Sequence, residues 1–122
     1  MPHRRQRLGT WGEAIAARLL QQRGYVILQK NVRISGLGEV DILARDGDTL
    51  VIVEVRTRRG GRPFAAEDSV GPRKHQRLSR LAQAIAQMWE WQGPLRVDLV
   101  AISLSGDGRV QGVHLWKDIV SG

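Results

Sequence analysis

Two carboxylates interrupt apolar, strand-like segments near the middle of the chain. Glu54 lies in the run Leu50–Arg56, which is otherwise apolar up to its last residue, as expected for a central strand covered on both faces. Asp41 lies in the preceding segment, over 39–45. Burying an unpaired carboxylate is costly, so each must be neutralised, paired or bound to a cation. Because Mg²⁺ and Mn²⁺ prefer a few carboxylates together with waters and phosphate oxygens, the pair favours a divalent-cation site for phosphate chemistry.

The register of a hairpin decides whether these two side chains meet. Strands are predicted over 39–45 and 50–57, joined by the turn-forming sequence Asp46–Thr49. If these four residues form the loop, Asp41 falls directly opposite Glu54. A two-residue loop is expected to shift the pairing but to keep the groups on one face. A three-residue loop would send Asp41 to the other face and remove the site.

An arginine follows the glutamate at strand spacing, so Arg56 and Glu54 point to the same face. The four-residue loop also places Glu39 opposite Arg56, and we expect these two to form an ion pair. Carboxylates placed opposite one another normally destabilise a hairpin, and a divalent cation would reverse that effect. The alternative is that Arg56, Lys74 or a neighbouring arginine forms ion pairs with Asp41 and Glu54.

The elements that position this pair are predicted from helix and turn signals. A helix is predicted over 11–23, because Thr10 and Glu13 have capping-box spacing and Gly24 supplies a stop. A second helix is predicted from Pro72 to about residue 91. Strands are predicted at the remaining apolar segments, over 25–29, 39–45, 50–57, 95–104 and 110–115. The order α-β-β-β-α-β-β predicts an α/β domain in which helices flank a mixed sheet.

Length and composition favour one compact domain over 1–122, with a flexible basic N-terminus over 1–8. The hydrophobic content of 42% is enough for a core. No apolar run approaches the roughly 20 residues that a membrane span needs, so no membrane association is expected. Cysteine is absent, which excludes disulfides and thiolate metal sites and fits a reducing cytoplasm.

The chain is strongly basic, with 19 Lys and Arg against 12 Asp and Glu and a net charge of +7. Such a domain attracts polyanions, of which nucleic acid is the commonest in a cytoplasm. The cations that follow the second hairpin strand and begin the second helix are the expected phosphate-binding residues: Arg58, Arg59, Arg62, Arg73, Lys74 and Arg77. The alternative is a solvated loop and helix face that binds nothing.

Several ordered blocks resemble one family of small bacterial proteins, the YraN-like family. The main blocks are Gly38-Glu39-Val40-Asp41, Val53-Glu54-Val55-Arg56 and Arg96-Val97-Asp98-Leu99-Val100. Three further matches are Gly9-x-x-Gly12-Glu13-x-x-Ala16, Gly24-Tyr25 and Asn31-Val32-Arg33. The resemblance extends from Gly9 to Leu104, and the combination of blocks is far more specific than any single motif.

The resemblance implies a restriction-endonuclease-like, or PD-(D/E)xK, fold similar to that of archaeal Holliday junction resolvases. It implies a metal-dependent endonuclease acting on DNA, including branched or damaged DNA, and suggests a homodimer. It assigns Asp41 and Glu54 as ligands of Mg²⁺ or Mn²⁺, and Glu13 as a helix-borne acid close to the same metal. The capping box alone would also explain Glu13. A fold alone does not establish an activity.

The sequence departs from this pattern at Arg56, where the family usually has the lysine of Glu-x-Lys. Arginine can stabilise negative charge on a phosphate, but it is a poor general base because it stays protonated. Lys74 could supply an ammonium group if the second helix faces the site. Two alternatives to a nuclease therefore remain: a non-catalytic nucleic-acid-binding module with the same fold, and a protein–protein adaptor with a structural salt-bridge network. Asp98 is expected to face solvent or to be ion-paired.

Overall fold

The computed structural model describes residues 4–59 and 71–120 of the chain. They form the elements α1 (Arg4–Gln22), β1 (Val26–Ile34), β2 (Gly38–Asp46), β3 (Thr49–Arg59), α2 (Pro72–Met88), β4 (Leu95–Leu104) and β5 (Val110–Trp116). The predicted order α-β-β-β-α-β-β is confirmed. Neither helix in the described ranges is long and apolar enough to cross a membrane.

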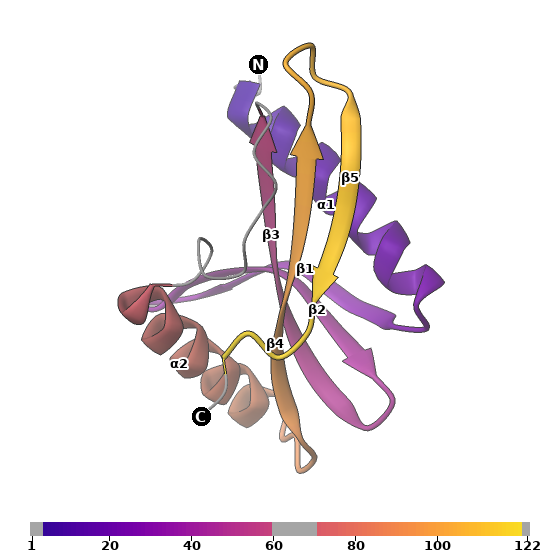
Figure 1. The fold of residues 1–122 in the computed structure, drawn as a ribbon. Helices are drawn as coiled ribbons and strands as arrows, with labels where there is room; N and C mark the ends of the chain where they lie inside the picture. The colour runs from indigo at the N-terminus through magenta and orange to yellow at the C-terminus, as the bar shows by residue number, and fades with distance from the viewer. Residues whose placement is uncertain (1–3, 60–70, 121–122) are drawn as a thin grey trace.

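The five strands form one sheet in the order β1-β2-β3-β4-β5 (Figure 1). β3 and β4 pair in parallel, because α2 lies between them in the chain and returns it to the same end of the sheet. The other neighbouring strands are antiparallel. The mixed sheet predicted from the order of elements is therefore confirmed.

Each helix covers one face of the sheet, so the described residues form two hydrophobic cores (Figure 1). The core under α1 includes Val51 and Val53 of β3, and the core under α2 includes Leu50 and Ile52. This alternation explains why the strand is apolar on both faces. The same alternation directs Glu54, the residue after Val53, toward the face that α2 covers.

The first helix is longer than expected. It begins at Arg4, so residues 4–8, expected to be flexible, are helical, and Thr10 and Glu13 lie inside the helix. The predicted capping box is therefore wrong. Arg, Gln and Leu favour a helix, and these residue types fill positions 4–8. The predicted stop is confirmed, since Gly24 has φ of +90° and the N–H that follows it donates to Leu20 O.

The hairpin between β2 and β3 has the predicted register but a tighter turn. Arg45 pairs with Leu50, as expected, and Asp46 pairs with Thr49. The turn is therefore the two residues Gly47 and Asp48, not four. Both descriptions give the same pairing, so the expectation that a two-residue turn would shift the register is wrong. Other limits also differ: β1 extends to Ile34 instead of residue 29, and α2 ends at Met88 instead of about residue 91.

Candidate active site

Asp41 lies where β2 separates from β3. The ladder between the two strands ends at the pair Ile42–Val53, one residue before Asp41 and Glu54 would face each other. Beyond that point, the Val55 N–H donates a hydrogen bond of 2.8 Å to Asp41 Oδ2. A side chain thus takes the place of a backbone acceptor, which fixes the carboxylate at the junction of the strands.

The surroundings of Asp41 disfavour its negative charge. Burial raises the pKa of Asp41 to about 6, and the hydrogen bond from Val55 only partly offsets this effect. The negative charges of Glu54, Glu13 and Glu39 raise it further. The protein is basic as a whole, yet at this point four carboxylates interact electrostatically. A cation placed here would therefore be stabilised.

Glu54 forms an ion pair with a cation of α2, the helix that covers the face to which Glu54 points. The Lys74 Nζ atom lies 2.8 Å from Glu54 Oε1, and the two side chains are only 20% and 15% exposed. Lys74 is in the first turn of α2, which follows Gly71. The structure therefore confirms that the start of this helix faces the carboxylate pair, and that Lys74 forms one of the ion pairs considered as an alternative to metal binding.

Glu13 lies on α1, and its negative charge acts on Asp41. Burial raises the pKa of Glu13, a hydrogen bond with Asn31 opposes the shift, and the charge of Glu39 adds to it. Within residues 4–59 and 71–120, no three His, Cys, Asp or Glu side chains are grouped closely enough to hold a metal ion. Of the three predicted ligands, Asp41 interacts electrostatically with both Glu54 and Glu13. Binding of a metal ion by Glu13, Asp41 and Glu54 stays a prediction.

The predicted placement of Glu39 opposite Arg56 is wrong. At this level β2 pairs with β1, where Glu39 lies opposite Arg33 and forms an exposed ion pair of 3.8 Å with it. The physical reason is the early end of the β2–β3 ladder. Arg56 is half-buried on β3, two residues after Glu54 and beside Ala101 of β4.

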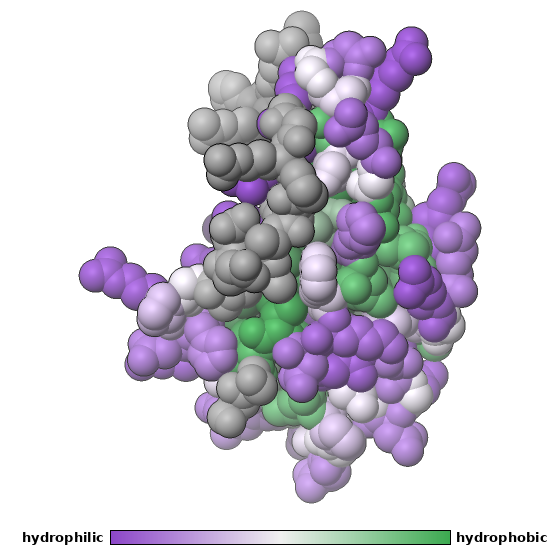
Figure 2. Space-filling view, in the orientation of Figure 1, coloured by the Kyte–Doolittle hydropathy of each residue, from purple (hydrophilic) through white to green (hydrophobic). Residues whose placement is uncertain are grey.

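Two arginines of α2 lie close to Lys74 in the sequence. Arg73 and Arg77 are exposed, and Lys74 lies between them in sequence. The stem of Arg77 runs next to β2, since a methyl group added at Gly38 would lie 3.9 Å from Arg77 Cδ. Hydrophilic side chains project from the beginning of α2 at the left of the molecular surface (Figure 2). Several cations are thus available beside the site.

The basic residues that end β3 lie further along the same strand. Arg58 and Arg59 are exposed. The guanidinium of Arg59 reaches the turn between β4 and β5, where a methyl group added at Gly108 would lie 3.0 Å from one of its nitrogens. Arg62 lies outside the described residues. A role of these arginines in nucleic-acid binding stays a prediction.

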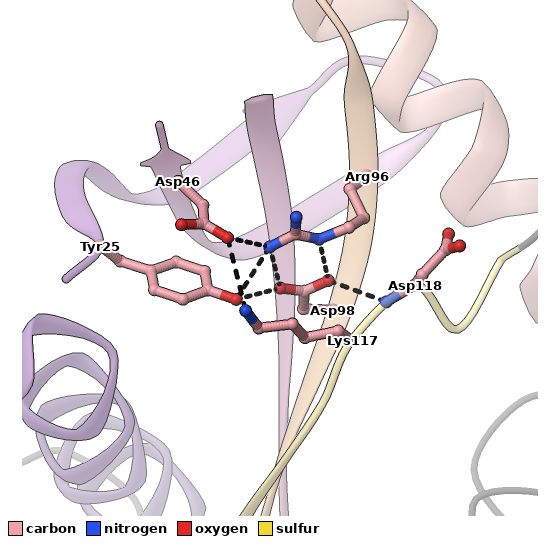
Figure 3. Close-up of polar contacts among 6 residues, drawn as sticks. All are labelled: Tyr25, Asp46, Arg96, Asp98, Lys117 and Asp118. Carbon is pink, nitrogen blue, oxygen red and sulfur yellow. Dashed lines mark hydrogen bonds and ion pairs between the residues drawn. The ribbon is translucent and has the colours of Figure 1, made fainter. Parts of the chain in front are cut away.

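A second polar cluster, which the sequence analysis missed, joins residues of β2 and β4 to residues next to the start of β1 and the end of β5 (Figure 3). Asp98 is 0% exposed, and it accepts a hydrogen bond of 2.6 Å from the Tyr25 hydroxyl and one of 2.9 Å from Arg96 Nε. Arg96 also forms an ion pair of 2.7 Å with Asp46, and the Lys117 ammonium lies 5.6 Å from the centre of the Tyr25 ring. The expectation that Asp98 is paired is confirmed, and the solvent-facing alternative is wrong.

This cluster is satisfied by its own members. Burial and the bond to Asp98 raise the pKa of Tyr25, while the bond from Arg96 lowers the pKa of Asp46. The Asp118 N–H also donates to Asp98, so the cluster fixes the segment after β5. Its role is structural. The only signal in the sequence was an Arg and an Asp at strand spacing within an apolar run, Arg96 and Asp98.

The fold and the carboxylate junction define a mixed α/β protein with an acidic site between two strands of its sheet. The chain belongs to the Uncharacterised protein family UPF0102, whose model matches residues 12–102. This match confirms the YraN-like family membership expected from the sequence blocks.

Similar proteins cover nearly the same length. A UPF0102 protein of Roseiflexus castenholzii is 47% identical over 106 residues, which are 85% of each chain. A UPF0102 protein of Streptomyces coelicolor is 45% identical over 83% of this chain and 79% of its own. A third, from Desulfitobacterium hafniense, is 38% identical over 95% of this chain and 97% of its own. These names give a family and no activity.

Proposed function

We propose that the protein is a metal-dependent endonuclease that hydrolyses phosphodiester bonds in DNA, including branched or damaged DNA. The observation that carries the proposal is the placement of Asp41 and Glu54 at the end of the β2–β3 ladder. Asp41 is held there although burial and neighbouring carboxylates raise its pKa to about 6. A buried, negatively charged Asp41 beside other carboxylates destabilises the fold unless a bound cation offsets the charge. Such a perturbed group is typical of a functional site.

The donor set suits Mg²⁺ or Mn²⁺. Each carboxylate has two oxygens, so Asp41 can keep its bond from Val55 and Glu54 its ion pair with Lys74 while each offers an oxygen to a cation. Two carboxylates completed by waters and phosphate oxygens are a common magnesium environment. Bound there, the metal would polarise the phosphate and lower the pKa of a water. Glu13 would add negative charge close by.

Arginine side chains around the site would bind the phosphate groups of the DNA. Arg56 shares the strand of Glu54 and would bind a phosphate oxygen pair through its planar fork. Arg73 and Arg77 would contact neighbouring phosphates, which position a strand without reading its sequence. The net charge of +7 favours a polyanionic substrate. By resemblance to the resolvases, the proposal includes a homodimer acting in the cytoplasm.

A cleavage assay on linear, flapped and four-way-junction DNA, with Mg²⁺ and with Mn²⁺, tests the proposal. We expect cleavage that EDTA abolishes and that falls at least about 100-fold in Asp41→Ala and in Glu54→Ala. Asp48→Ala is the matched control, because it removes an exposed carboxylate from the hairpin turn. Salt-sensitive DNA binding without cleavage would instead indicate a binding module. Neither binding nor cleavage at low salt would indicate a protein–protein adaptor.

A further inference from the structure

Lys74 occupies a position that helix stability does not favour. It is the third residue of α2, where the partial positive charge of the helix N-terminus repels a cation. The N-cap Gly71 offers no side-chain acceptor that would offset this effect. Even so, Lys74 is only 20% exposed and is directed to Glu54 Oε1 at 2.8 Å. The carboxylate site therefore determines where this side chain lies.

Anchoring of the helix does not need this ion pair. α2 already contributes Leu78, Leu81 and Ile85 to the core, and each of them is 0–1% exposed. Burial of such side chains stabilises a helix on a core considerably more than an ion pair near the surface does. A structural role explains little of why Lys74 approaches a candidate metal ligand.

We propose that Lys74 supplies the catalytic ammonium group of the site, a role that the usual lysine at the position of Arg56 would otherwise fill. The inference rests on the proposed nuclease function. In the hydrolysis, a water molecule releases a proton to solvent as its oxygen forms a bond to phosphorus, one ester P–O bond breaks, and the departing oxygen takes up a proton from solvent. Lys74 stabilises the negative charge that gathers on the phosphate oxygens during this step.

The chemistry of the two cations supports this division of roles. An ammonium group has three N–H donors, so Lys74 can keep its contact with Glu54 and still donate to a phosphate oxygen. It is a compact charge on a flexible stem, whereas Arg56 presents a broad, planar fork from the strand itself. Arg56 therefore suits ground-state binding of the phosphate, and Lys74 suits the charge that develops later.

The test compares Lys74→Met and Lys74→Arg with Arg73→Met, which removes an exposed cation from the adjacent position. We expect kcat for DNA cleavage to fall about 100-fold or more in Lys74→Met while KM changes little. Lys74→Arg should recover part of that loss, because the charge is restored. Arg73→Met should change mainly KM, and Arg56→Lys should gain little activity.

A second readout does not depend on cleavage. Titration of each variant with Mn²⁺ alone should show several-fold tighter binding in Lys74→Met, since a positive charge beside Glu54 has been removed. Arg73→Met should bind Mn²⁺ as the wild type does. If Lys74 had only a structural role, its replacement would instead destabilise the site, and Mn²⁺ binding would weaken in proportion to the loss of folded protein.

The outcomes separate this inference from the proposed function. If the wild type cleaves DNA and Lys74→Met cleaves equally well, the inference about Lys74 is wrong and the proposed function stands. A second result also overturns the inference: Lys74→Met binds Mn²⁺ more weakly, and its cleavage rate falls only in proportion to the fraction of protein that is no longer folded. If the wild type cleaves none of the DNA substrates with either metal, both fail together.

Discussion

Asp41 is ionised at neutral pH at an energetic cost to the fold. Its pKa is about 6 in the folded protein, against an ordinary value near 3.8. Between these two values the folded chain retains a proton that the unfolded chain has released. The free energy of unfolding therefore falls as the pH rises from about 4 to about 6, and the loss persists at neutral pH.

Replacement of Asp41 by Asn removes this cost. The amide carries no charge, and its oxygen can still accept the hydrogen bond from Val55. We expect Asp41→Asn to raise the free energy of unfolding at pH 7 by about 1–3 kcal/mol, and to change it little at pH 4. Urea unfolding of the metal-free protein at both pH values measures the difference.

The control for this prediction is Asp48→Asn, because Asp48 is an exposed acid of the same type in the hairpin turn. It should leave the dependence of stability on pH unchanged. If Asp41→Asn lost stability between pH 4 and pH 6 as steeply as the wild type does, the charge of Asp41 would not be the cause. The same substitution should abolish cleavage, so that stability and activity change in opposite directions.

At the scale of elements, α1 depends on a close approach to β3. A methyl group added at Gly12 would lie 2.9 Å from Thr57 Oγ1 and 3.6 Å from Ile102 Cδ1. Thr57 is half-buried on the central strand β3, which is paired with β4 at this level, so neither backbone has room to move freely. Gly12 is therefore required for packing, although glycine is a poor helix former.

We expect Gly12→Ala to lower the free energy of unfolding by about 1–3 kcal/mol, even though alanine favours the helix by about 1 kcal/mol. The double variant Gly12→Ala with Thr57→Ala removes the clashing oxygen and should recover most of the loss. Urea unfolding of the two single variants and the double variant gives the coupling energy. Gly106→Ala is the control, since nothing lies within 4 Å of its added methyl group. If the losses of stability in the two single variants simply added in the double variant, a clash between the two side chains would be contradicted.

Most of the element order was predictable because strand and helix patterns are local. The β2–β3 register followed from Asp46–Thr49, and the span of β4 was predicted correctly as Leu95–Leu104. The length of α1 was not predictable from a capping motif, since Thr10 and Glu13 lie within a helix that continues on both sides. Local signals identify an element more reliably than they locate its ends.

The candidate site was predictable in part. The hairpin register predicted from Asp46–Thr49 directs Asp41 and Glu54 to neighbouring positions, and Lys74 could be suggested because it lies in the first turn of a helix. The point where β2 leaves β3 could not be predicted. It depends on the Val55 N–H, which donates to the Asp41 side chain instead of to a backbone carbonyl of β2. For the same reason the placement of Glu39 opposite Arg56 was wrong, because β2 pairs with β1 at that level.

At the scale of the whole molecule, the two helices divide the basic surface between opposite sides of the sheet. Arg73 and Arg77 are exposed on α2, the helix that borders the carboxylate pair. Arg18 and Arg23 are exposed at the other face, on α1 and directly after it. The four arginines contribute equally to the net charge of +7. A comparison between them therefore separates local contacts with DNA from general attraction.

We expect Arg73→Ala and Arg77→Ala each to weaken DNA binding and to reduce the slope of log K against log salt by about 1, because one phosphate contact is lost. Arg18→Ala and Arg23→Ala lower the net charge by the same amount and should leave the slope nearly unchanged. Fluorescence anisotropy with a four-way junction, between about 50 and 200 mM salt, measures these slopes. If all four variants reduced the slope equally, DNA would bind without preference for the side of α2, and the proposed site would lose its substrate-binding surface.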